Sequence, residues 1–78
     1  MILGMYFITI PNLIEGKVPE ASQYLTDLGY NNIEKVSISG LTYSIKFKAV
    51  KKDEKFYIWV RFVNGGGMSI RKYEKITE

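Results

Sequence analysis

The chain lacks the two residue types that most often support catalysis and metal binding. Its 78 residues include no cysteine and no histidine. Without cysteine it can form no disulfide and no thiolate site, which fits a reducing compartment such as the cytoplasm. Without histidine it lacks the commonest metal ligand and the commonest general base at neutral pH. We therefore expect a non-catalytic protein with no metal and no cofactor.

Long hydrophobic runs are also missing. The most apolar segment, "MILGMYFITI", is followed by Pro11 and is about half as long as a membrane-spanning helix. It has no basic start and no small-residue cleavage site of the kind that export signals carry. We expect a strand over residues 2–10, an irregular connection over 12–17, and a cytoplasmic protein without membrane contact.

Basic residues are scarce in the first half of the chain and concentrated in the second. The net charge is +3, yet only Lys17 and Lys35 of the eleven basic residues precede residue 40. The same half contains several carboxylates, so the basic character belongs to residues 40–78. Such asymmetry favours an acidic partner.

Residues 18–29 carry the signals of the single helix that we expect. Pro19 suits the first helical turn, and Gly29 follows the last periodic position, where a left-handed cap is expected. Tyr30 can then pack back over the helix end. The apolar stripe of this helix is formed by Val18, Ala21, Leu25 and Leu28.

The rest of the chain reads as strands separated by short turns. Alternating apolar and polar residues predict strands over 33–39, 41–50, 55–63 and 68–76. The fold class that follows is α+β. We expect one domain over residues 1–78, with a four- or five-stranded antiparallel sheet and one helix packed on one face. The first strand can lie beside a central strand or along an edge.

The registers of the last two hairpins can be predicted from burial. A loop over residues 51–54 sets Phe47 opposite Ile58, and a loop over 63–67 sets Phe62 opposite Met68; both place apolar residues on one face. The predicted core consists of Val18, Ala21, Leu25, Leu28, Val36, Ile38, Tyr43, Ile45, Phe47, Phe56, Ile58, Val60, Phe62, Met68 and Ile70.

The same registers leave a second sheet face that is both aromatic and basic. They set Trp59 beside Arg71 and Tyr57 beside Tyr73. The candidate binding residues are Trp59, Arg71, Tyr57, Tyr73, Arg61, Lys46 and Lys48. A purely structural interpretation remains open, in which Arg71 covers Trp59 in an intramolecular cation–π contact or the amino-terminal segment lies on this face.

Two families share features with this pattern. Residues 24–67 resemble a PepSY-type unit, with a helix ending at "LGY" and antiparallel strands after it. The chain departs from that family because it has no export signal and has "KDEK" in place of an Asp-Gly turn. The resemblance implies an inhibitory or regulatory module. The triple glycine followed by an arginine-bearing strand is similar to small archaeal chromatin proteins over about fifteen residues, and the preceding helix and strands do not fit them.

Our functional hypothesis is a small binding or regulatory protein, such as an inhibitor of a host or partner protein. Tyr, Trp and Arg are enriched in protein interface hot spots, and the basic surface favours an acidic protein partner. Short, cysteine-free and lysine-rich chains of this kind are also typical of phage proteins. The alternative is a single-stranded nucleic-acid binder that stacks bases on the same aromatic residues. A homodimer through this face would leave the same sequence pattern.

Overall fold

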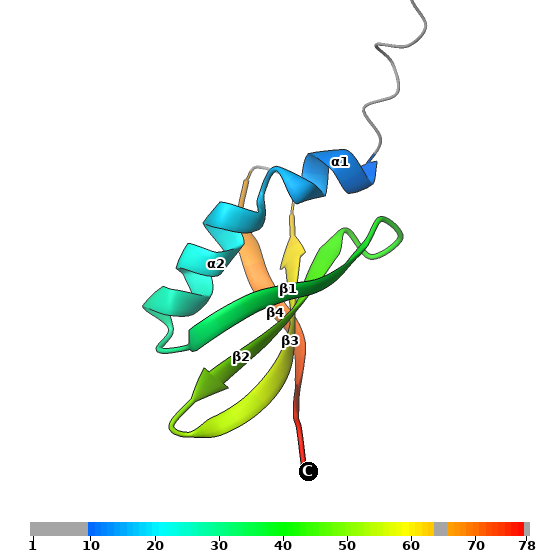
Figure 1. Cartoon of the computed structure of the whole chain (residues 1–78). Helices are drawn as coiled ribbons and strands as arrows, with labels where there is room; N and C mark the ends of the chain where they lie inside the picture. Colours follow the sequence, from blue (N-terminus) through cyan, green and yellow to red (C-terminus); the bar gives the residue numbers. More distant parts are fainter. Residues whose placement is uncertain (1–9, 64–65, 78) are drawn as a thin grey trace, which may run out of the picture.

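The protein has an α+β fold in which helices cover one side of a four-stranded antiparallel sheet (Figure 1). The computed structural model describes residues 10–63 and 66–77. Its strands follow one another in space in the order β1-β2-β3-β4. This confirms the predicted fold class. The elements are α1 (Ile10–Glu15), α2 (Val18–Asp27), β1 (Asn31–Ser39), β2 (Ser44–Lys51), β3 (Glu54–Phe62) and β4 (Met68–Lys75).

Helix α1 replaces the irregular connection that the sequence predicts over residues 12–17. It begins at Ile10, so the last residue of the predicted first strand is helical; residues 2–9 of that strand lie outside the described part of the chain. Pro11 falls in the first turn, where its missing N–H is not needed. Ile14 is fully buried, and burial of this side chain explains why so short a helix persists.

Helix α2 confirms the predicted helix and its cap. Gly29 adopts a φ of +100°, which a residue with a side chain rarely adopts. The backbone N–H of Tyr30 then donates to the carbonyl of Leu25 at 3.0 Å, which closes the helix end. Ala21 and Leu25 are buried as expected. Leu28 is exposed, so its assignment to the core is wrong.

The β2–β3 hairpin has the predicted register. Phe47 lies opposite Ile58 and Lys46 lies opposite Trp59. The connection is shorter than the predicted four-residue loop, because Lys51 also pairs with Glu54. Lys52 and Asp53 both have positive φ angles, of 52° and 64°, as in the tight turns whose twist matches the two strands.

The core lies between the helices and the sheet. Its buried residues come from both helices, from Tyr30 just before β1, and from β2 and β3. Ile14, Tyr30 and Ala49 belong to this core although they are not in the predicted one. Val36 is exposed, so the prediction for it is wrong. The pairing of β1 skips Val36 as the extra residue of a β-bulge, which lets Ile33 and Ile38 both pack on the core.

Burial raises the pKa of the Tyr30 hydroxyl above 10.0, with a smaller contribution from Tyr73. Because the unfolded chain then ionises Tyr30 more easily than the folded one, the stabilisation that this residue provides is complete below pH 10 and is lost as the pH rises through the folded-state pKa. We expect urea unfolding from pH 8 to 11 to show a steeper alkaline loss of stability in wild type than in Tyr30→Phe. Equal slopes would contradict this prediction.

Candidate aromatic–basic interface

The outer face of the sheet, on the side away from the helices, carries the predicted candidate residues of β2 and β3. Lys46 lies opposite Trp59, Lys48 opposite Tyr57, and Ser44 opposite Arg61. These pairs alternate with the buried pairs of the core, so their side chains point to the other side of the sheet. The predicted register, and with it the outward placement of these residues, is confirmed.

A β-bulge in β4 changes the partners predicted for this strand. Val60 pairs with Ile70 as expected, yet Trp59 pairs with Lys72, which leaves Arg71 as an extra residue. The prediction that Arg71 lies beside Trp59 is therefore wrong; Lys72 does. Tyr73 is placed opposite Ile58 instead of Tyr57.

The new position of Tyr73 puts its side chain on the helix side of the sheet. Its ring packs edge-on against that of Phe56, with 6.0 Å between the centroids. Its placement on the aromatic–basic side is therefore wrong, although the residue is 63% exposed. Tyr73 lies at the rim of the core.

The bulge decides which β4 side chains share a side with the core. Strict alternation after Ile70 would set Lys72 and Glu74 opposite Ile58 and Phe56, whereas one extra residue at Arg71 sets Tyr73 and Lys75 there instead. Both positions are open to solvent, since Tyr73 is 63% exposed and Lys75 forms an exposed ion pair. The bulge therefore exchanges a lysine for an aromatic ring that packs edge-on against Phe56. The odd spacing of Tyr73 from Ile70 is the sequence signal that could have revealed both the bulge and Lys72.

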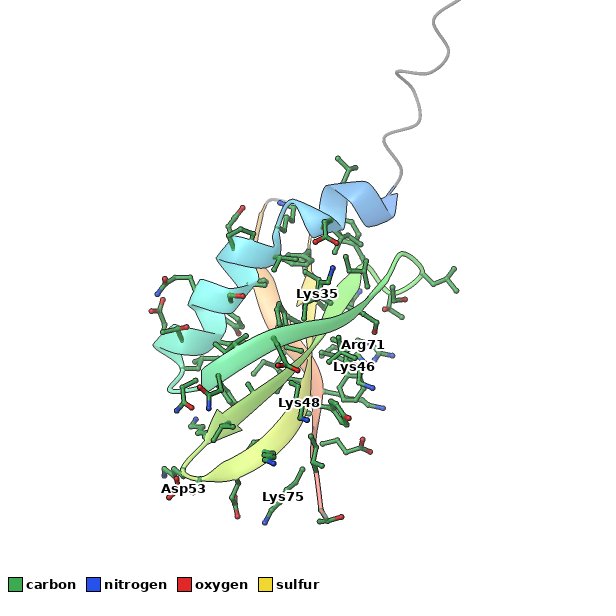
Figure 2. The ribbon with its side chains drawn as sticks, viewed as in Figure 1. Lys35, Lys46, Lys48, Asp53, Arg71 and Lys75 are labelled. Atoms are coloured by element: carbon green, nitrogen blue, oxygen red, sulfur yellow. The ribbon has the colours of Figure 1, made fainter. Side chains whose placement is uncertain are left out.

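We define the aromatic–basic face as the outer surface formed by Lys46, Lys48, Tyr57, Trp59, Arg61, Arg71 and Lys72. Figure 2 shows Lys46 and Arg71 projecting from the same side of the sheet. Tyr57, Trp59, Lys46 and Lys48 are half-buried, whereas Arg61, Arg71 and Lys72 are exposed.

Trp59 is the centre of this face. The ammonium of Lys46 lies 5.1 Å from the indole centroid and that of Lys72 lies 4.5 Å from it, so lysines from both neighbouring strands contact the ring. Lys46 also lies 4.2 Å from the centroid of Tyr57. The two rings are 6.4 Å apart. These cation–π contacts, each worth about 0.5–1 kcal/mol when exposed, hold the lysines in place. Trp59 therefore does form intramolecular cation–π contacts, but with Lys46 and Lys72 and not with Arg71 as predicted.

Charge on the aromatic–basic face is unbalanced. Glu34, opposite Lys48, and Glu74, opposite Tyr57, add carboxylates to the same side of the sheet. Even so, within the described residues the ion pairs are Lys35–Glu15 and Lys75–Glu54, and both involve residues that the register places on the helix side. The basic residues of the face form no ion pair with any described carboxylate.

A pocket of about 310 Å³ opens at the end of this face, below the turn that joins β1 to β2. Its lining includes Arg61 from β3 and Arg71 from the β4 bulge. Two guanidinium groups in one polar hollow can receive an anionic group. The remaining lining residues are Leu41, Thr42, Tyr43 and Phe62.

Other kinds of site have little support in the described part of the chain. No group of acidic side chains there has the geometry to hold a metal ion. None of the described helices has the length and apolar character needed to cross a membrane. Comparison of the chain with family models, with curated proteins and with solved structures gave no match. The aromatic–basic face is therefore the functional candidate among the described residues.

Proposed function

We propose that the protein is a small non-catalytic binding module that docks its aromatic–basic face on an acidic surface of a partner protein. The observation that carries the proposal is the gathering of five cations around Tyr57 and Trp59 on one side of the sheet, none of them in an ion pair with a described carboxylate. On the helix side, Lys35 and Lys75 are neutralised by carboxylates, and Lys17 and Lys51 lie singly over the rings of Phe62 and Tyr30. A cluster of unpaired cations around a partly exposed tryptophan is typical of an interface hot spot.

Two features favour a protein partner over single-stranded nucleic acid. The indole of Trp59 is already contacted by Lys46 and Lys72, so a base could stack on it only by displacing a lysine. Glu34 and Glu74 lie on the same side of the sheet and would repel a phosphate backbone. A protein surface can offer both signs of charge. Because docking alone can block a partner's site, inhibition or regulation would need no catalytic group.

Replacement of Trp59 by alanine tests the proposal. We expect a loss of partner affinity of about 30-fold or more, since buried aromatic anchors at interfaces contribute about 2 kcal/mol or more. The variant should lose only about 1–2 kcal/mol of folding stability, because the ring is half-buried and its contacts are two lysines and Tyr57. The affinity of a partner isolated with the wild-type chain is measured by calorimetry, and the stability by urea unfolding.

Tyr73→Ala is the matched control, because Tyr73 is an exposed aromatic residue of the neighbouring strand that lies on the helix side. It should leave the affinity within about twofold. Equal binding by wild type and Trp59→Ala would overturn the proposal. So would oligonucleotide binding that falls steeply and log-linearly with salt, which identifies a nucleic-acid binder. A Trp59-dependent dimer in sedimentation, with no other partner, would assign the face to self-association.

A further inference from the structure

The turn that joins β1 to β2 is held over one end of the outer face. Ser44 occupies an outward register position opposite Arg61, yet it is fully buried. The turn must therefore cover it. The hydroxyl oxygens of Thr42 and Ser44 lie 2.6 Å apart, and the N–H of Thr42 donates to Ser39 Oγ at 3.3 Å. These side-chain hydrogen bonds fix the conformation of the turn, which forms one side of the pocket.

The turn that forms this side of the pocket is also fixed to the end of β3, through Tyr43. Tyr43 adopts a φ of +52°, which is uncommon for a residue with a side chain. Its carbonyl accepts a hydrogen bond from the N–H of Phe62 at 3.0 Å, and the two rings pack edge-on with centroids 6.0 Å apart. The turn is therefore attached to the end of β3 by backbone and by side chains.

Two arginines line this pocket, and a bulge places one of them there. Arg71 is the extra residue of β4, and bulges commonly redirect a side chain at a functional site. Arg61 approaches from the neighbouring strand. Both side chains are exposed, and neither forms an ion pair with a carboxylate in the described ranges. The pocket thus holds uncompensated positive charge.

We propose that this arginine pocket binds a carboxylate of the partner, supplied by an Asp or Glu side chain that has an apolar neighbour. The guanidinium group offers two parallel N–H donors that match the two oxygens of a carboxylate. Leu41 is fully exposed on the pocket rim and would contact the apolar neighbour. The inference rests on the proposed function, because it names the acidic group that the docking surface receives.

The test is an NMR titration of the isotope-labelled full chain with the dipeptide acetyl-Leu-Asp-amide. We expect saturable shifts of the Arg61 and Arg71 Nε–H signals and of the Thr42 and Tyr43 amides, with a dissociation constant on the order of 1–10 mM. Acetyl-Leu-Asn-amide, which lacks the charge, should produce no saturable shift. Arg71→Gln should weaken the binding about tenfold or more.

Two further variants distinguish binding in the pocket from general attraction to the positive charge of the face. Lys48→Gln removes the same charge from the same face but lies outside the pocket, and it should change the dissociation constant by about twofold or less. Thr42→Val leaves the charge unchanged and removes the bond to Ser44, so it should weaken binding about threefold or more. The second variant reports on the turn that forms the pocket wall.

Several outcomes would overturn the inference. Equal weakening of dipeptide binding by Lys48→Gln and Arg71→Gln would show that the dipeptide is attracted by the overall positive charge and not by the pocket. Saturable binding of phenyl phosphate without binding of the acidic dipeptide would show a phosphoryl site, which favours a nucleic-acid ligand. Because the titration uses no partner protein, its failure leaves the Trp59 test of the docking surface intact, and failure of that test leaves the titration result intact.

Discussion

Replacing Phe47 with alanine is expected to destabilise the protein by about 3–5 kcal/mol. Phe47 is fully buried, and its side chain is the largest among the fully buried ones of the described residues. A domain of 78 residues has a total stability of about 4–12 kcal/mol, so this loss removes about a quarter of it or more. Urea unfolding followed by the fluorescence of the single tryptophan measures the change.

Val50→Ala provides the control for this substitution. Val50 lies in the same strand, at an outward register position opposite Lys55, and is half-buried. The loss should be about 1 kcal/mol, because the substitution removes only two methyl groups from a side chain that is partly open to solvent. Similar losses for the two variants would mean that the two faces of β2 are not distinguished by burial, and the proposed outer face would have no basis.

Replacing Ile14 with alanine should cost about 2–5 kcal/mol, although its helix has only six residues. Ile14 is fully buried, and α1 contributes to the core through it. The effect would show that residues 10–15 are part of the folded domain. Thermal unfolding by circular dichroism should record a correspondingly lower midpoint for this variant.

The adjacent residue offers a closely matched control. Leu13 is 50% exposed in the same helix, so Leu13→Ala should change the stability by about 0.5 kcal/mol or less. A loss for Ile14→Ala as small as this would contradict the packing of α1 on the sheet. Equal large losses for both variants would indicate that α1 buries a different face from the one described here.

The β2–β3 pairing shows how much of the fold could be predicted from local sequence. Its alternation is regular on both strands, so a single register buries Ile45, Phe47, Ile58 and Val60 together. The end of α2 was equally predictable, since glycine, which has no Cβ, is the residue that readily accepts the φ of +100° found at Gly29. In both cases the determining interactions lie within one hairpin or one helix end.

The candidate interface was predicted only in part. Lys46, Lys48, Tyr57, Trp59 and Arg61 lie where the alternation places them. The partners contributed by β4 were not predicted correctly, because the bulge at Arg71 exchanges the faces of the residues that follow it. Helix α1 was missed because the signal of Pro11 fits both the end of a strand and the start of a helix.

The sequence by itself therefore determined the fold class, the helix with its cap, and the outward positions of Trp59 and its neighbours on β2 and β3. Only the tertiary structure decided that Lys72 contacts Trp59, that Tyr73 lies on the helix side, and that Arg61 and Arg71 share a pocket. The physical reason is that strand period is a local property, whereas the position of a bulge depends on how the whole strand pairs with its neighbour and packs against it.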